Sequence, residues 1–489
     1  MIVEWLLQAF HGQDLFLIVC TIHRWEEVPI GCVCFILQAA RNLGQAGCIY
    51  WLYKSMVMKN SSIHSNPAWA ILFAFLPLGS CQDKLLETYE VNNPIYMSYE
   101  DLRSAVSDTT PAAISRPGKI YLYGDLILVN EVRKGVHVIN NTDPANPEVI
   151  SFIKVPGNID MAIKNNILYA DSYVDLVAID ISDLHNIREV ARFEDLFSWS
   201  LPPYEAGTRV GLVDDAKGVV VDWKVETVTE ELDWEDQQLV YPTRMWESAM
   251  RMDMVSFATA NGTGDGSMTG TGGSMARFII YHDMLYVIDQ SNLHMFDINH
   301  ELAPVSAGSK QIGWNIETVF IAREHLFIGS TTGMYIYSLI DPANPEFVST
   351  YWHVTSCDPV VVEGNYAYIT LRTGNICETD VNQLEIVDIH KLASPIKIKS
   401  YPMNNPHGLG IDQGILFICD GDAGLKVYDA SDPLNLNANQ LAHFTEINTF
   451  DVIPVQKHLI MIGEDGLYQY DYVDVQDINL LSMIPIVAD

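Results

Sequence analysis

Apolar and polar residues alternate in short runs along most of the chain, and tight turns separate the runs. Residues 384–388 (Leu-Glu-Ile-Val-Asp) and 425–429 (Leu-Lys-Val-Tyr-Asp) show this period of two with β-branched and aromatic side chains, which indicates strands. Seven such runs lead to an Asp-Pro-x-Asn-Pro turn or a degenerate version of it, at residues 143–147, 186–187, 303–304, 341–345, 394–395, 432–435 and 477–478. A strand-rich repeat of roughly 40 residues is typical of a β-propeller.

The repeats predict an all-β fold, a seven-bladed β-propeller of four-stranded blades over residues 116–489. The predicted blades are residues 116–157, 158–197, 277–313, 314–356, 357–405, 406–448 and 449–485. Residues 198–276 are an insertion between the second and third blades. Within it, residues 218–225 read as a strand at the outer edge of the second blade, and the Gly/Thr/Ser-rich residues 261–274 are expected to be flexible.

The strand that precedes each turn carries a family resemblance. Leu-Glu-Ile-Val-Asp at residues 384–388 has variants at 135–139, 176–180 and 425–429, and Asp-Pro-x-Asn-Pro turns follow strands of this kind. This pattern resembles the LVIVD-repeat family of bacterial β-propeller proteins, over residues 116–485. The resemblance implies a propeller in a secreted or surface lipoprotein, and it implies no catalytic residue set.

The region before the repeats has the layout of a lipoprotein leader. In residues 58–80 a Lys follows Met58, an apolar stretch comes next, and Leu-Gly-Ser precedes Cys81, which predicts a signal peptide and a lipid anchor on Cys81. Because a signal peptide must be N-terminal, residues 1–57 are interpreted as an over-extended start without structure. The alternative is a cytoplasmic extension followed by a weak membrane anchor. Residues 81–115 read as a polar tether.

The net charge limits the classes of partner that the chain can bind. The formal net charge is −34, which excludes nucleic acid because phosphate binding needs clustered Lys and Arg. Contact with a membrane is therefore expected only through the lipid on Cys81. The protein is expected to be exported, and to lie at the outer membrane, on the cell surface or facing the periplasm.

Cys357 and Cys377 flank one predicted hairpin and are expected to form a disulfide, with two free thiols as the alternative. Cys419 is expected to be a buried single thiol.

Aligning the repeats brings one set of polar residues to equivalent positions at the start of the inner strands. These are Asp160, Glu317, Asp358, His407 and Asp451, with Arg116 and Arg277 nearby. Because equivalent positions surround the axis of a repeat ring, the side chains should line one mouth of the central channel. Converging carboxylates favour a cation or cationic ligand there. The alternative is a solvated acidic rim with two compensating arginines.

The chain lacks the sequence motifs of common catalytic sites, such as GxSxG, HExxH and the Walker loop. Three functions stay open: a module that binds a protein or saccharide, a metal-assisted hydrolase or lyase at the acidic mouth, and a structural part of an outer-membrane assembly. No cofactor is identified, and a divalent cation is the one that the acidic mouth would accommodate. Trp199, Trp223, Trp234 and Trp246 gather in and near the insertion, where they would cover a blade or stack on a partner.

Overall fold

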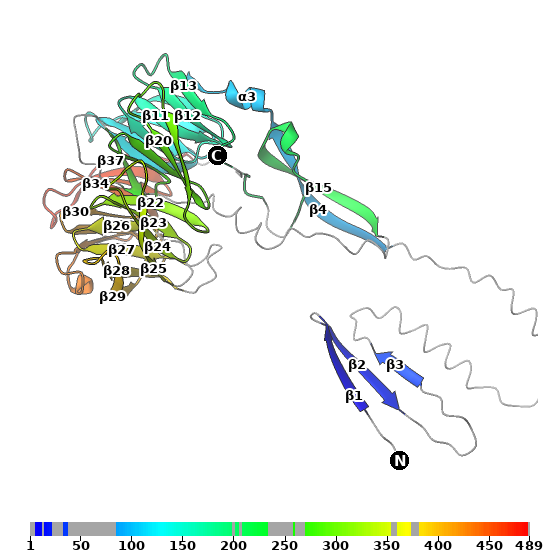
Figure 1. Cartoon of the computed structure of the whole chain (residues 1–489). Helices are drawn as coiled ribbons and strands as arrows, with labels where there is room; N and C mark the ends of the chain where they lie inside the picture. Colours follow the sequence, from blue (N-terminus) through cyan, green and yellow to red (C-terminus); the bar gives the residue numbers. More distant parts are fainter. Residues whose placement is uncertain are drawn as a thin grey trace, which may run out of the picture. The chain divides into compact units, whose positions relative to one another are not determined.

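The computed structural model describes residues 5–11, 14–21, 33–37, 85–197, 201–204, 208–232, 258–259, 269–353, 359–372 and 381–487. The chain divides into two compact units, Met1–Asp83 and Lys84–Asp489 (Figure 1). The first contains β1 (Trp5–His11), β2 (Asp14–Thr21) and β3 (Val33–Leu37), which form one antiparallel sheet in chain order where the sequence predicts no structure. Residues 58–81, with the predicted signal peptide and Cys81, lie outside the described residues.

Within the part of the chain that the structure describes, no helix is long and apolar enough to cross a membrane.

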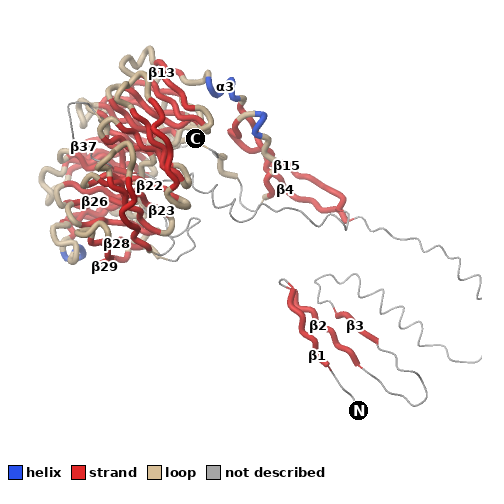
Figure 2. The backbone as a smooth tube through the Cα atoms, viewed as in Figure 1, coloured by secondary structure: helices blue, strands red, loops and turns tan. Residues whose placement is uncertain are grey.

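Six four-stranded antiparallel sheets make up most of the second unit, and the strands of each sheet lie side by side in chain order. Figure 2 shows that strands dominate this unit. The first three are β10 (Met161–Lys164), β11 (Ile167–Ser172), β12 (Asp175–Asp180) and β13 (Arg188–Phe193); β18 (Phe278–Tyr281), β19 (Met284–Ile288), β20 (Asn292–Asp297) and β21 (Val305–Gln311); and β22 (Ile316–Ala322), β23 (His325–Ser330), β24 (Gly333–Ser338) and β25 (Glu346–Trp352). The next three are β26 (Val360–Glu363), β27 (Tyr366–Leu371), β28 (Gln383–Asp388) and β29 (Ile396–Pro402); β30 (Leu409–Asp412), β31 (Ile415–Cys419), β32 (Leu425–Asp429) and β33 (Gln440–Phe444); and β34 (Thr449–Val455), β35 (His458–Gly463), β36 (Gly466–Asp471) and β37 (Asn479–Pro485).

One further sheet precedes these in the chain and is wider. Its central strands repeat the same order, and they are β6 (Pro117–Tyr123), β7 (Leu126–Glu131), β8 (Gly135–Asn140) and β9 (Glu148–Lys154). On the side of β9 the short strand β5 (Ser107–Thr109) is added. On the side of β6 the insertion adds β17 (Thr271–Ser274) and then β16 (Ala258–Thr259). Each of the seven stretches that the sequence predicts as a repeat thus contains the four strands of one sheet.

The third strand of every sheet ends in a side chain that organises the following turn. Its oxygen accepts a hydrogen bond from the backbone N–H two residues later, an arrangement that favours a turn over a longer strand. The seven residues are Asn140, Asp180, Asp297, Ser338, Asp388, Asp429 and Asp471. In the turn itself a backbone N–H donates to the carbonyl three residues earlier; the seven donors are Asn146, Asn186, Ala303, Asn344, Ser394, Asn435 and Asp477. These donors lie in the seven turns that the sequence identifies.

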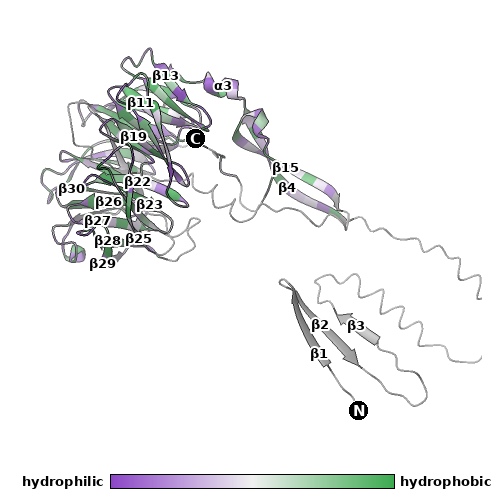
Figure 3. Ribbon diagram, viewed as in Figure 1, coloured by the Kyte–Doolittle hydropathy of each residue, from purple (hydrophilic) through white to green (hydrophobic). Residues whose placement is uncertain are grey.

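The apolar core lies between neighbouring sheets, where the alternating apolar side chains of facing strands meet. In Figure 3 hydrophobic residues colour much of the strands of the second unit. The last and first sheets share a core in the same way, through Ile460 of β35 and Ile127 of β7 among others. Hydrogen bonds reinforce this closure: Gln469 Nε2 donates to Asn141 Oδ1 at 2.7 Å, and Ser482 Oγ donates to the Pro144 carbonyl at 2.6 Å. The ends of the repeat region therefore pack together although about 300 residues separate them in sequence.

Outside the repeats, the strand predicted at residues 218–225 pairs with a different partner from the one expected. Residues 218–225 do not form the outer edge of the second sheet, because β13 holds that position. They belong to β15 (Val219–Leu232), which pairs antiparallel with β4 (Leu85–Met97), while β14 (Arg209–Val210) pairs with the other edge of β4. Since β4 lies in the predicted tether, much of that tether is an ordered strand. The short helix α3 (Tyr99–Arg103) follows it.

Candidate functional site

The predicted ring residues begin the inner strands, as the repeat alignment requires, but most of them are buried. Asp160, Glu317, His407 and Asp451 are each less than a tenth exposed. Arg277 is half-buried and Arg116 is exposed. Asp358 lies outside the described residues, as do Cys81, Cys357 and Cys377. The alternative of a solvated acidic rim does not describe these four residues, and their lining of a ligand-binding mouth stays a prediction.

The burial of Asp451 and Asp160 is due in part to β17 and the residues after it, and β17 occupies the inner edge of the first sheet. Thr271 and Gly272 pair with Leu122 and Tyr121 of β6, the innermost repeat strand of that sheet. The same short strand lies against the inner strands β30 and β34 of two other sheets. Ser274 fixes this position, because its Oγ accepts a hydrogen bond from the Leu409 N–H at 2.8 Å. The end of the insertion, expected to be flexible, is thus a strand inside the ring of sheets.

Asp160 holds the chain where it leaves β17. Its carboxylate accepts hydrogen bonds from the Arg277 N–H at 2.5 Å and from Lys119 Nζ at 3.2 Å. Lys119 Nζ also donates to the Met275 carbonyl at 2.6 Å. Burial lowers the pKa of Lys119, and the charge of Asp160 opposes that shift. Lys119, which the repeat alignment does not single out, therefore links two sheets to the inserted segment.

Asp451 contacts β17 from the last sheet. Its Oδ1 lies 3.4 Å from Ser274 Oγ, and its Oδ2 has no hydrogen-bond partner among the described residues. A Cβ on Gly273 would lie 1.7 Å from Oδ2, so only glycine fits opposite this carboxyl group. Burial raises the pKa of Asp451 to about 8, although backbone hydrogen bonds and Lys119 oppose the shift.

Glu317 and His407 belong to a second polar group around Arg372. Arg372 Nη1 lies 3.2 Å from His407 Nδ1 and 3.3 Å from Nε2. Burial lowers the pKa of His407 to about 3, and the charge of Arg372 lowers it further, so the ring is neutral at pH 7. Burial also lowers the pKa of Arg372, against the opposing charge of Glu317. The predicted ring is thus brought together in two groups, and its binding of a ligand stays a prediction.

An exposed aromatic patch was not found from the sequence. We define it as Trp314, Tyr335 and Trp352 of the fourth sheet and the loop before it. Trp314 is 73% exposed and Trp352 is 64% exposed. The rings of Tyr335 and Trp352 meet edge to face at 6.1 Å, and the backbone at Gly313 packs on the Tyr335 hydroxyl. Trp314 and Trp352 stand at the two ends of one predicted repeat, residues 314–356, and only the fold shows that Tyr335 contacts both Trp352 and the loop that carries Trp314.

The aromatic patch lies at the end of its sheet where the inner strand begins. Loop 312–315 enters β22 at this end, and β24 begins and β25 finishes at it because neighbouring strands run antiparallel. We call this the entry end. The Asp-Pro turn at residues 341–345 lies at the opposite end. Of the insertion's tryptophans, Trp223 donates its Nε1–H to the Pro202 carbonyl at 2.7 Å, and the other three lie outside the described residues.

Comparison with known proteins supports the repeat assignment. Residues 356–402 match the LVIVD repeat, and this segment contains β26 to β29. The chain therefore carries the predicted repeat, and together with the recurring four-stranded sheets this confirms an all-β repeat protein with a β-propeller fold. Curated proteins gave no significant match.

Solved structures include distant matches. BamB from Moraxella catarrhalis is 8% identical, with 79% of this chain and 97% of that chain covered and a TM-score of 0.40. Kluyveromyces lactis Hsv2 is 8% identical, with 63% and 72% covered and a TM-score of 0.33.

Proposed function

We propose that this LVIVD-repeat protein is an exported, lipid-anchored, seven-bladed β-propeller that binds a protein partner through the aromatic patch at its entry end. Two observations support the blade number: seven sheets share one strand order, and the last sheet shares a core with the first. The membrane attachment rests on the sequence around Cys81.

The aromatic patch carries the proposal. Tryptophan and tyrosine contribute most to the affinity of protein interfaces because they bury a large apolar area with little loss of side-chain entropy. Two mostly exposed tryptophans at one end of a sheet, with Tyr335 packed on Trp352 and on the loop of Trp314, are unusual in a chain that is strongly acidic. Their exposure suits a docking site, since exposed apolar patches with polar surroundings mark interaction sites.

The burial of the channel residues also favours a binding site on the outer surface over one at the channel mouth. Asp160, Glu317, His407 and Asp451 are buried against the chain's own atoms, and β17 with the residues after it contacts Asp451 and Asp160, so these two carboxyl groups are not open to a substrate. The hydrolase or lyase alternative has no supporting contact in the described residues. The assembly alternative has one supporting observation, because Leu212 and Val225 of the insertion are exposed apolar residues.

Photo-crosslinking tests the binding site. We expect p-benzoylphenylalanine at position 352 to give a crosslink to a distinct protein in cells that express the full chain. The same probe at position 340 should not, because Ile340 is 84% exposed but lies at the opposite end of that sheet. Trp314→Ala should weaken the crosslink at 352 without lowering the melting temperature.

The outcomes separate the alternatives. Equal crosslinking at both positions, or none at 352, would contradict the proposed protein partner. A crosslink between two copies of the chain would support the assembly alternative. Absence of a crosslink together with binding to a glycan array that is lost in Trp352→Ala would replace the protein by a saccharide.

The lipid anchor has a separate test. Cells fed an alkyne fatty acid should label the wild-type protein, and Cys81→Ala should abolish the label and release the protein from the membrane fraction. Cys419→Ala, which removes a buried thiol of the repeat region, is the matched control and should keep the label. Unchanged labelling of Cys81→Ala would remove the anchor from the proposal and leave the aromatic patch untouched.

A further inference from the structure

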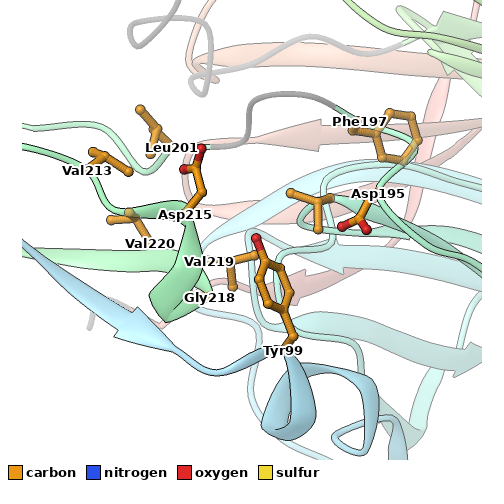
Figure 4. A pocket seen from close by; sticks show the side chains of 10 residues that line it. Tyr99, Asp195, Phe197, Leu201, Val213, Asp215, Gly218, Val219 and Val220 are labelled. Carbon is orange, nitrogen blue, oxygen red and sulfur yellow. The ribbon is translucent and has the colours of Figure 1, made fainter.

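A cavity of about 170 Å³ lies beside the second sheet, away from the aromatic patch (Figure 4). Its walls come from α3, from the loop before β15 and the start of β15, from the turn between β11 and β12, and from the segment that follows β13. The lining residues used below are Tyr99, Asp195, Phe197, Val213, Asp215 and Val219. A cavity of about 150 Å³ accommodates benzene, so this one suits a small organic molecule.

The wall that carries Tyr99 is held firmly. Leu102 of α3 is fully buried against Tyr173 and Val219. Arg103 forms ion pairs with Asp175 at 3.1 Å, Glu194 at 2.7 Å and Asp195 at 3.2 Å. These contacts tie α3 to the second sheet, so the ring of Tyr99 keeps its place at the cavity.

The electrostatic balance at the cavity is negative. Five carboxylates gather here, those of Asp175, Glu189, Glu194, Asp195 and Asp215, and two guanidinium groups, Arg103 and Arg192, pair with the first four. In the described residues no cation lies within ion-pair distance of Asp215. Burial, then the charges of Asp195 and Asp215, raise the pKa of Tyr99, so both carboxylates act on its hydroxyl group.

We propose that this cavity binds a small organic cation, an ammonium group on a compact apolar body. Asp195 and Asp215 would attract the charge, and the rings of Tyr99 and Phe197 offer aromatic faces, which hold quaternary ammonium groups well. Val213 and Val219 would contact the apolar body. The net charge of −34 favours the approach of cations over anions. The proposal does not rest on the aromatic patch, whose tryptophans do not line this cavity.

Calorimetric titration of the full chain with choline tests the site, and 3,3-dimethylbutan-1-ol serves as its neutral isostere. We expect saturable binding of choline that is at least tenfold tighter than binding of the alcohol. Asp215→Asn should weaken choline binding about tenfold because it removes one charge at short range. Tyr99→Phe keeps an aromatic face and should retain most of the affinity, whereas Tyr99→Leu should lose it.

Asp214→Asn is the matched control. Asp214 is an exposed neighbour of Asp215 that pairs with Lys217 and does not line the cavity, and an asparagine can still accept the Ala216 N–H. Its affinity for choline should equal that of the wild type. No saturable binding of choline, equal affinity for choline and the alcohol, or equal losses in Asp214→Asn and Asp215→Asn would overturn the proposal.

Discussion

Asp451 shows what a single polar residue does in the centre of this protein. The repeat alignment predicts its position at the start of an inner strand, and the structure places it there. Its burial could not be predicted, because some of the atoms that cover it belong to residues 273–274, far away in sequence and without a strand pattern. The cost of burying a charge keeps the proton on this carboxyl group.

The raised pKa gives a pH-dependent stability. Between the ordinary value of 3.8 and about 8 the folded state holds a proton that the unfolded state releases, so the contribution of Asp451 to stability falls as pH rises. Asp451→Asn removes this contribution. We expect the variant to gain stability relative to the wild type by about 1 kcal/mol or more between pH 5 and pH 8.

Urea denaturation of both proteins across this pH range measures the difference. The charged and titratable groups around Asp451 remain in both proteins, so the comparison isolates the titration of Asp451. These groups are Lys119, Asp160, Arg277 and Cys419. A constant difference between the two proteins from pH 5 to pH 8 would mean that Asp451 is ionised in the folded state.

At the scale of the element, the repeating turn explains the aspartate that ends the Leu-Glu-Ile-Val-Asp strand. Asp388 Oδ1 accepts hydrogen bonds from the His390 N–H at 2.8 Å and from its Nδ1 at 2.9 Å. The first sheet uses Asn140 in the same way. The local chemistry of this turn needs only a short side chain with an acceptor oxygen, which is why the sequence alone identifies the turn seven times.

A substitution at Asp388 tests this role. Asp388→Ala should lower the free energy of unfolding by about 1 kcal/mol, because the turn loses an acceptor for a backbone N–H. Asp388→Asn keeps an acceptor oxygen and should stay within about 0.5 kcal/mol of the wild type. Chemical denaturation measures both values. Equal losses in the two variants would show that the charge, and not the acceptor, matters at this position.

The strand β17 shows the limit of prediction for elements. The repeat strands have alternating apolar residues, and their boundaries follow from the sequence. Residues 271–274 are Thr-Gly-Gly-Ser, a composition that is typical of a flexible loop. They form a strand because β6 offers an unpaired inner edge and because glycines fit a space that Asp451 and Tyr121 leave narrow. Tertiary contacts, and not local preference, decide this element.

For the whole molecule, β17 occupies the inner edge of the first sheet, in the region to which the sequence assigns the site. The sequence predicts the ring of sheets and points to its centre as the site, because equivalent polar residues converge there. The structure fills that centre with the chain's own strand, and the apolar aromatic side chains that are free to meet a partner lie at the entry end of the fourth sheet. The sequence favours the acidic mouth of the channel as the candidate binding site, whereas the fold exposes an aromatic patch on the outer surface. This is the main difference between the prediction and the fold.

Hydrogen–deuterium exchange over residues 269–276 of the unbound protein tests this central claim most directly. Gly270 donates its N–H to Ile163 and Thr271 and Gly272 pair with β6, so these amides should exchange as slowly as those of the inner strands. The exposed turn at residues 143–147 is the fast reference. Slow exchange of residues 269–276 is the predicted result, and exchange as fast as in that turn would contradict the account, because the channel would then be open to a ligand.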